Sequence, residues 1–238
     1  MRIIGPGRAG GSFAGALRAV GWNVDLLARD ASPVGSAVGV DLVLLCVPDS
    51  VVAEMAAEIG PSPDAVVAHC AGALTLDALG AHPRRASLHP LVSLPSAEVG
   101  AERLRSGAWF AVAGDPIVSR VVDDLGGRVV EPPEARRVEY HAAAVVASNH
   151  LVALMGQVER IAADLGVPLE AFLDLAAGSL AGVADIGAAA ALTGPVARGD
   201  WATVRAHIGA LPTDEQEAYI ALARAAARLI GAEAPELP

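Results

Sequence analysis

The feature that most constrains the fold is a glycine-rich turn at the start of the chain. A short apolar segment, Arg2–Ile4, leads into Gly5-Pro6-Gly7-Arg8-Ala9-Gly10, and a helix of small residues is predicted directly after it. In a G-x-G-x-x-G turn the first glycine closes the turn, the second lets the backbone approach a ligand, and the third allows the helix to pack closely on the strand. The sequence therefore predicts that the chain begins with a β-α-β unit.

Strand and helix patterns alternate through the first 130 residues. The clearest strand is Asp41–Val47, a continuous apolar run that is typical of a parallel strand buried on both faces. This alternation predicts an α/β Rossmann domain, with a doubly wound, mostly parallel sheet between helices. The other predicted strands are Arg2–Ile4, Val24–Ala28, Ala65–His69, Arg85–Leu88, Ala108–Ala113 and Arg128–Val130, and the predicted helices are Gly11–Val20, Val51–Ile59 and Ile117–Leu125.

The pattern changes at Glu131-Pro132-Pro133. Two prolines after a strand terminate both sheet and helix, and no strand pattern follows them. We therefore expect a dinucleotide-binding α/β domain over residues 1–133 and an all-α C-terminal domain over residues 134–238. The helices predicted in this second domain are a long one over Glu134–Leu165, then Leu169–Leu180, Val183–Leu192, Trp201–Ala210 and Thr213–Ile230.

Composition narrows the choice of partners and location. The formal net charge of −10 argues against nucleic acid or an anionic membrane surface as the main partner. No apolar run reaches the ~18 residues of a membrane span, so the apolar excess is assigned to cores and a subunit interface. No signal peptide is expected, and Cys46 and Cys70 are expected to be reduced packing thiols rather than metal ligands. These features predict a cytoplasmic protein without a metal site.

The glycine turn is the first candidate binding site. A helix N-terminus offers free N–H groups and a partial positive charge to an anion, so the turn suits the pyrophosphate of a dinucleotide. A glycine turn without a ligand is the structural alternative. The residues that we assign to the cofactor here are Gly5, Pro6, Gly7, Arg8, Ala9 and Gly10.

The end of the second strand bears on the choice between NADP and NAD. An NAD enzyme usually places an acidic residue there to hold the ribose hydroxyls, but this chain has Arg29 followed by Asp30. The planar guanidinium of Arg29 matches the geometry of a 2′-phosphate and favours NADP(H). A shift in register would bring Asp30 to the ribose instead, and a solvated Arg29 without a ligand is the structural alternative.

Two further strand ends are expected to border the cofactor. The carboxyl ends of parallel strands face the ligand crevice of a doubly wound sheet. Val47-Pro48-Asp49 follows the third strand, where Asp49 could also cap the next helix. Ala71 and Gly72 follow the fourth strand, where small residues would let a nicotinamide ring lie close to the backbone.

Catalytic residues are predicted on the fifth strand and on the long helix. His89 could hydrogen-bond or protonate a substrate oxygen at neutral pH, or it could be a structural histidine bonded to the backbone. On the helix, His141 and Ser148 share one face and Asn149 lies close to it. Buried polar residues need partners, which either a substrate or neighbouring helices would supply.

The turn Thr193-Gly194-Pro195-Val196-Ala197-Arg198-Gly199-Asp200 lies between two predicted helices. Two glycines and a proline make it rigid, and it displays Thr193 and Arg198 as candidates for binding an anionic group of the substrate. An Arg198–Asp200 pair that holds the helices together is the alternative.

The whole chain resembles a family of two-domain proteins that join a Rossmann-like domain to a helical C-terminal domain of unassigned function. The matching segments are GPGRAG, LLCVPD, HCAGAL, SLHPL, YHAAAVVASNHLVAL and LTGPVARGD. The family is similar to ketopantoate reductase, pyrroline-5-carboxylate reductase and 6-phosphogluconate dehydrogenase, and some members are similar to an alternative ketopantoate reductase. The resemblance implies NADP(H), an arginine after the second strand that faces the 2′-phosphate, and a homodimer formed through the C-terminal helices.

One departure from these relatives concerns the acid–base residue. Ketopantoate reductase and 6-phosphogluconate dehydrogenase carry a lysine four residues before the asparagine that matches Asn149, but Val145 stands there in this chain. Acid–base work is therefore expected from His89, His141, His150 or water. The sequence favours an NADP(H)-dependent reductase of a small carbonyl or imine, such as ketopantoate. The alternatives are a dinucleotide-binding sensor without catalysis and hydride exchange with a deazaflavin.

Overall fold

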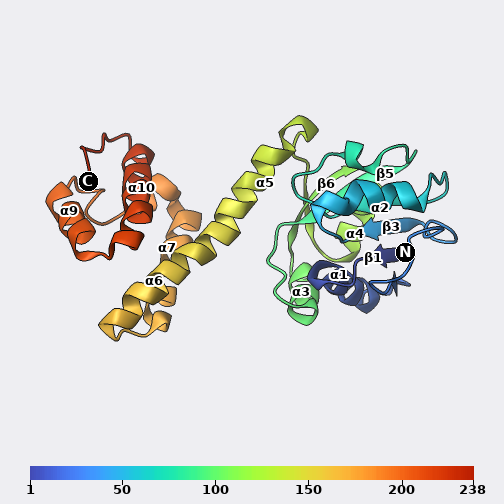
Figure 1. Ribbon diagram of the computed structural model, residues 1–238, viewed down its shortest axis with the longest axis horizontal. Coiled ribbons are helices and arrows are strands. Elements are labelled where there is room, and N and C mark those ends of the chain that lie inside the picture. Colours follow the sequence, from blue (N-terminus) through green and yellow to red (C-terminus); the bar gives the residue numbers. More distant parts are fainter. The chain divides into compact units, whose positions relative to one another are not determined.

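The computed structural model describes residues 1–238 and divides them into two compact units, Met1–Ser148 and Asn149–Pro238 (Figure 1). The first unit contains all the strands, and the second is built from helices. The fold class predicted from the sequence, an α/β Rossmann-like sheet followed by an all-α region, is confirmed. No helix in the molecule is both long enough and apolar enough to cross a membrane.

A seven-stranded sheet forms the centre of the first unit, in the order β2-β1-β3-β4-β5-β6-β7. All neighbouring strands run parallel except β5 and β6, so β6 and β7 run against the other five. Every predicted strand is present, because buried parallel strands are recognisable as apolar runs. The strands are β1 (Arg2–Ile4), β2 (Asp25–Leu26), β3 (Leu42–Leu45), β4 (Val66–His69), β5 (Arg85–Pro90), β6 (Trp109–Gly114) and β7 (Arg128–Val130).

Helices cover both faces of the sheet, and each face has its own core. Alternate residues of β3 divide between them: Leu44 packs on the face covered by α1 (Arg8–Ala19), α3 (Ala97–Leu104) and α4 (Ile117–Asp124). Leu45 packs on the other face, which is covered by α2 (Val52–Ile59) and the 3-10 turn η2 (Leu76–Leu79). Helix α3 was not predicted, although Ser96 caps it by accepting a hydrogen bond from the Val99 N–H at 3.2 Å.

The strand order places a topological switch point between β1 and β3. From β1 the chain crosses to β2 on one side and then returns to β3 on the other. Ligands of open α/β sheets bind outside the carboxyl ends of the strands at such a point. The glycine turn, which directly follows β1, therefore lies where a doubly wound sheet binds its ligand.

The sheet ends at Val130, but the first unit extends further, to Ser148. The sequence places the end of the α/β domain at residue 133 because the prolines stand there. Residues beyond it still pack on the sheet unit: Glu134 accepts a hydrogen bond from the Leu76 N–H at 3.0 Å, and Arg137 donates to the Ala71 carbonyl at 3.2 Å. These two contacts bind the start of the long helical segment to the loop that follows β4.

The predicted long helix is divided into several segments. It begins with a 3-10 turn, η3 (Glu134–Arg136), followed by α5 (Arg137–Val145) and by a stretch of π-helix, η4 (Val146–His150). The segment then continues as α6 (Leu151–Leu165). π-Helical turns often occur at functional sites, and this one contains Ser148 and Asn149.

The second unit contains four further helices. The predicted break between Leu180 and Val183 is wrong: a single helix, α7, continues to Ile186, because one glycine inside a helix costs only about 1 kcal/mol. It ends at Gly187, whose φ is +80°. The helices are α7 (Leu169–Ile186), α8 (Ala188–Ala191), α9 (Trp201–Ala210) and α10 (Thr213–Leu229).

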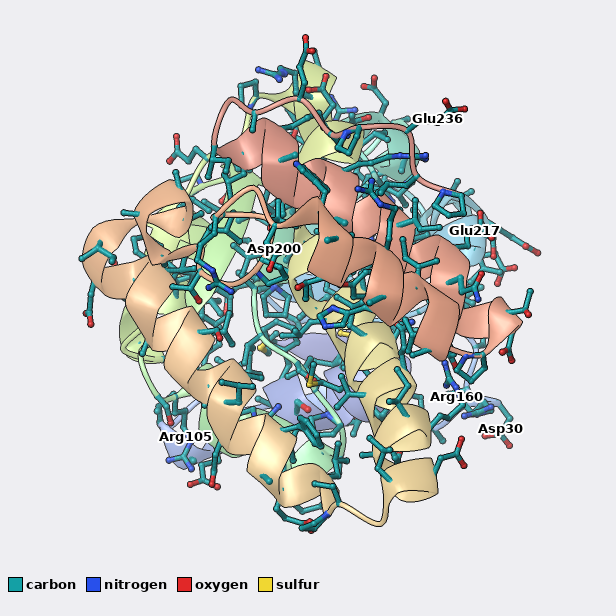
Figure 2. The ribbon with its side chains drawn as sticks, turned by 90° about the vertical axis from the view of Figure 1, so that its left-hand side faces the viewer. Asp30, Arg105, Arg160, Asp200, Glu217 and Glu236 are labelled. Atoms are coloured by element: carbon teal, nitrogen blue, oxygen red, sulfur yellow. The ribbon has the colours of Figure 1, made fainter.

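Two buried polar residues, Gln157 and Glu215, and the exposed Arg160 join α6 to α10 within the second unit. Arg160 of α6 pairs with the carboxylate of Glu215 on α10, and Gln157 donates to the Glu215 backbone carbonyl at 2.8 Å. Arg160 is labelled in Figure 2, together with Asp200 at the start of α9. Pro212 is the N-cap of α10, and the Gln216 side chain donates to the Leu211 carbonyl at 3.0 Å.

Candidate functional site

The three glycines of the turn differ in the space around them. Gly5 has a φ of +102°, and a Cβ there would lie 2.3 Å from the Cys46 carbonyl oxygen on β3. A Cβ on Gly10 would lie 2.0 Å from the Gly5 carbonyl oxygen, whereas a Cβ on Gly7 would meet nothing within 4 Å. Gly5 and Gly10 are therefore required by packing, and Gly7 leaves an open approach to the backbone.

The start of α1 is suited to an anion. Gly7 is its N-cap, no side chain caps the first turn, and no acidic residue lies in that turn. The N–H groups at this end are not neutralised by a carboxylate, so they and the helix dipole can act on a bound phosphate. The open face at Gly7 and the uncapped helix end fit the pyrophosphate of a dinucleotide.

Arg29 and Asp30 follow β2 in an exposed turn at the same edge of the sheet. Neither side chain forms an ion pair or a hydrogen bond, and Asp30 can be located in Figure 2. Arg8, the first residue of α1, is also exposed. The structure thus leaves the guanidinium groups of Arg8 and Arg29 available to a phosphate-bearing ligand.

The turn after β3 contacts the glycine turn. The Val47 side chain would lie 3.1 Å from a Cβ on Gly5. Pro48 is the N-cap of the short 3-10 turn η1 (Asp49–Val51), and Asp49 makes no capping hydrogen bond. The expectation that Asp49 caps the next helix is therefore wrong, because the chain enters η1 at Asp49 itself.

Two thiols follow β3 and β4 at this edge. Cys46 and Cys70 are both free, and a hydrogen bond with Cys70 together with burial raises the pKa of the Cys46 thiol well above its usual range. A thiol that stays protonated is a poor nucleophile. The pair therefore acts as packing, and the candidate chemistry lies elsewhere at this edge.

Ala71 and Gly72, after β4, contact the start of the helical segment. The Ala71 carbonyl accepts a hydrogen bond from Arg137, and a Cβ on Gly72 would lie 2.1 Å from Nδ1 of His141. The absence of a side chain at Gly72 is thus required by the His141 ring. The sequence suggested that small residues here make room for a nicotinamide ring, and the structure adds a second reason for them.

A cluster of aromatic polar side chains forms where β5 meets α5. Nδ1 of His89 lies 2.7 Å from the Tyr140 hydroxyl, and the two rings meet edge to face with centroids 5.7 Å apart. The His141 ring approaches His89 in the same manner, with centroids 5.5 Å apart. His89 and His141, predicted from distant parts of the sequence, are therefore brought together. Tyr140, on the same helix as His141, is the third member of the cluster.

The pKa shifts of His89 and Tyr140 keep these two side chains neutral at physiological pH. Burial, followed by the nearby His141, Arg137 and His69, lowers the pKa of His89 to about 4. Burial raises the pKa of Tyr140 to about 12. From the sequence, His89 was expected either to hydrogen-bond a substrate oxygen or to protonate it. A pKa this low favours the hydrogen bond, because the ring carries no extra proton at pH 7.

Three residues of this cluster were not assigned a role from the sequence: Arg137, Glu134 and Tyr140. Arg137 is 1% exposed, and its Nε and Nη1 have no hydrogen-bond partner, nor has the Glu134 Oε1 atom. The only sequence signal is their place directly after the two prolines and beside His141. Glu134 and Arg137 contact the Ala71–Leu76 loop, which lies some sixty residues earlier in the chain.

Ser148 and Asn149 lie in the π-helical stretch, where Ser148 ends the first unit and Asn149 begins the second. Both residues are exposed, and the Ser148 hydroxyl donates to the Ala144 carbonyl at 3.0 Å. His150, the third histidine considered for acid–base work, is exposed in the same stretch. A catalytic role for these residues stays a prediction.

Thr193 and Arg198 are exposed in a turn of the second unit. The turn is held by its own backbone, with the Asp200 N–H donating to the Pro195 carbonyl at 2.8 Å. Asp200 caps α9 by accepting from the Thr203 N–H at 3.1 Å, and it forms no ion pair with Arg198. The alternative in which an Arg198–Asp200 pair holds the helices is therefore wrong, and binding of substrate by Thr193 and Arg198 stays a prediction.

The sequence and the structure were compared with known proteins. Residues 111–226 match a family model described as a domain of unknown function, DUF2520. No curated protein matches the sequence. Among solved structures, a Bacteroides fragilis protein described as a candidate NADP oxidoreductase is similar over 95% of this chain and 97% of its own, at 19% identity and a TM-score of 0.79.

Two other solved structures show the same architecture. A Thermotoga maritima protein of no stated activity is 25% identical over 96% of this chain and 97% of its own, with a TM-score of 0.71. The pyrroline carboxylate reductase of Plasmodium falciparum, solved with NADP bound, is 14% identical over 94% of this chain and 97% of its own, with a TM-score of 0.65. The chain thus has the two-part fold of this group of Rossmann-like proteins.

The different roles of Gly10 and Gly7 can be separated by alanine substitution. Gly10→Ala should lower the free energy of unfolding by about 1–3 kcal/mol, because the new methyl group overlaps the Gly5 carbonyl. Gly7→Ala should lower it by less than about 1 kcal/mol, because the new methyl group points into open space and only the N-cap preference for glycine over alanine is lost. Urea denaturation measures both. Equal losses in the two variants would contradict the packing that we describe.

Proposed function

We propose that this protein is an NADP(H)-dependent oxidoreductase that reduces a small carbonyl or imine compound. The observation that carries the proposal is the glycine turn at the switch point of the sheet, with its open face at Gly7 and the uncapped start of α1. The cofactor-binding residues are those of the turn with Arg29, Val47, Pro48, Asp49, Ala71 and Gly72. The fold shared with NADP-binding relatives supports this choice.

The preference for NADP(H) over NAD(H) rests on Arg29. It follows β2 at the carboxyl edge, is exposed, and forms no ion pair, so its guanidinium can bind a 2′-phosphate with two parallel hydrogen bonds. Asp30 beside it is the residue that would favour NAD(H). One of the three similar structures was solved with NADP bound and a second is described as a candidate NADP oxidoreductase, which supports the first assignment.

Bound NADPH would supply the hydride, and the residues of the first unit would supply donors to the substrate. His89 and Tyr140 form a hydrogen-bonded pair, with His141 beside them, and can polarise a substrate oxygen or nitrogen. We assign Ser148 and Asn149 to orientation of the substrate. No lysine exists in the chain, so the proton comes through these groups or from water.

The substrate that we favour is a small 2-oxo acid such as ketopantoate, or a cyclic imine. Thr193 and Arg198 are assigned to its carboxylate, since an exposed guanidinium binds carboxylates well. One of the similar structures is named a pyrroline carboxylate reductase, which supports the inclusion of imines. The cytoplasmic location predicted from the sequence agrees with a soluble cofactor of this kind.

A sensor that binds the dinucleotide without catalysis is the second candidate. The observation that favours it is Val145 at the position of the lysine in related reductases. A fold does not by itself imply a reaction. Binding of NADPH without oxidation against a panel of 2-oxo acids and cyclic imines would establish the sensor instead of the reductase.

The exposed apolar surface of α7 supports a homodimer formed through the C-terminal helices. No residue of this 18-residue helix is buried, and its exposed large apolar side chains are Leu173, Leu175, Leu180, Val183 and Ile186. Apolar surface of this extent on one helix commonly marks an interface. Light scattering on the intact chain should give twice its mass of 24.0 kDa, and a monomer at micromolar concentration would contradict the dimer.

Loss of the Arg29 charge should weaken binding of NADPH but not of NADH. Removing charge-assisted hydrogen bonds to a phosphate costs about 1.5–3 kcal/mol, so Arg29→Met should raise the Kd for NADPH about 10- to 100-fold. Isothermal titration with both nucleotides measures the change. The control is Arg120→Met on α4, where the arginine pairs with Asp124, and it should leave both constants unchanged. If binding of NADPH and binding of NADH were weakened equally, the assignment of Arg29 to the 2′-phosphate would be contradicted.

Loss of the donor at His89 should lower turnover without loss of cofactor. His89→Gln should reduce kcat about 10²- to 10³-fold, as for loss of one transition-state donor, and leave the Kd for NADPH within about twofold. Asn149→Ala should act in the same direction. His207→Gln is the matched control, because His207 forms the same 2.7 Å pair with Tyr219 in the second unit. Equal losses of turnover and cofactor affinity would count against both assignments.

A further inference from the structure

Arg137 is a buried cation that forms no direct ion pair, and the Glu134 carboxylate acts on it only at longer range. Its side chain is 1% exposed and forms no ion pair, and Nε and Nη1 have no hydrogen-bond partner. A buried charge without a direct ion pair is costly, and replacing buried ionic groups with apolar side chains of similar size is often neutral or stabilising. Packing alone therefore does not account for an arginine at this position.

The contacts of Arg137 link two parts of the candidate site. Nη2 donates to the Ala71 carbonyl at 3.2 Å, which holds the loop after β4. The guanidinium carbon lies 5.5 Å from the centre of the Tyr140 ring, one turn further along α5. The Tyr140 hydroxyl lies in turn 2.7 Å from Nδ1 of His89. The arginine thus contacts the loop and the tyrosine that is hydrogen-bonded to His89, and its charge also acts on His89.

We propose that Arg137 is a positioning residue of this site: its buried charge adds to burial and to His141 in holding His89 as a neutral imidazole, and its contact with Tyr140 supports the pair that leaves the hydrogen of His89 on Nε2. This inference rests on the proposed function for its catalytic meaning. His89 is then a neutral hydrogen-bond donor to the substrate, rather than a cationic acid.

The position of the hydrogen follows from the Tyr140–His89 pair. A phenol is the more acidic donor of the two groups, and an imidazole nitrogen is the more basic acceptor, so the tyrosine hydroxyl donates to Nδ1. A neutral imidazole that accepts at Nδ1 carries its hydrogen on Nε2. Protonation of His89 would put a hydrogen on Nδ1 as well and break this arrangement.

Four groups face His89 from the elements packed around it. Tyr140, His141 and Arg137 lie on α5, and His69 lies on β4. Burial lowers the pKa of His89 most, followed by His141, Arg137 and His69. Among these neighbours the guanidinium alone keeps its charge at every physiological pH. The contribution of Arg137 is therefore constant across that range, and it can be removed by one substitution.

Titration of His89 by NMR tests the proposal directly. In the wild type the His89 ring should titrate at about pH 4, and in Arg137→Met it should titrate closer to its ordinary value of 6.5. Arg137→Lys keeps the charge and should keep the low pKa. Arg136→Met is the matched control, because this neighbouring arginine is exposed and paired with Glu139, and it should leave the titration unchanged.

Three results would overturn the proposal. The first is a His89 that titrates identically in the wild type and in Arg137→Met. The second is an equal rise in Arg137→Met and Arg137→Lys, which would assign the effect to packing instead of charge. The third is a wild-type ring whose ¹⁵N shifts show the hydrogen on Nδ1. Tyr140→Phe, which keeps the aromatic ring and removes only the hydroxyl, provides an independent variant. In this variant the ¹⁵N shifts of the His89 ring should no longer show a preference for the form with hydrogen on Nε2.

A second readout connects Arg137 to turnover. If the neutral ring is the active form, activity falls as the pH falls through the pKa of His89, and Arg137→Met should move this acid limb of kcat/KM to higher pH. An unmoved acid limb would contradict the link to turnover. The NMR result does not depend on NADPH, so a protein that fails to bind the nucleotide but shows the shift would refute the proposed function and leave the role of Arg137 in place.

Discussion

The close approach of the glycine turn to strand β3 is the contact on which the rest of the structure depends. Gly5 and Gly10 pack against the Cys46 carbonyl and against each other at distances that leave no room for a Cβ. This brings the end of β1 and the start of α1 to the switch point of the sheet, and it leaves the Gly7 backbone open. A phosphate-binding geometry is thus a by-product of how the first β-α-β unit must pack.

The same principle recurs where the sheet meets the helical segment. Gly72 lies so close to the His141 ring that a side chain is excluded, and this contact sets His141 beside His89 at the end of β5. The surroundings of His89 are largely buried and contain the charge of Arg137, which together disfavour protonation of the His89 imidazole. A site of this kind stabilises developing negative charge with neutral donors. Such donors suit hydride transfer to a carbonyl, where charge builds up on the oxygen.

The sequence predicted the sheet well and the site in part. Each strand was found because strands buried on both faces are continuous apolar runs, and the turn was found because its glycines have defined spacing. Helix α3 was missed, although Ser96 marks its start. Arg137 and Tyr140 were missed because their meaning depends on long-range contacts, with Ala71 and with His89, which no local pattern encodes. The π-helical stretch was missed for a related reason, since a helical pattern does not distinguish it from α-helix.

The central claim is that backbone N–H groups at the start of α1 bind the pyrophosphate of NADPH. Hydrogen–deuterium exchange of the intact chain, with and without NADPH, tests it at the level of single segments. The account predicts that NADPH slows exchange in the segment that contains Gly7 and Gly10, and that the far end of the sheet, at β7, does not change. Binding of NADPH that leaves exchange in this turn unaltered, or no binding at all, would contradict it.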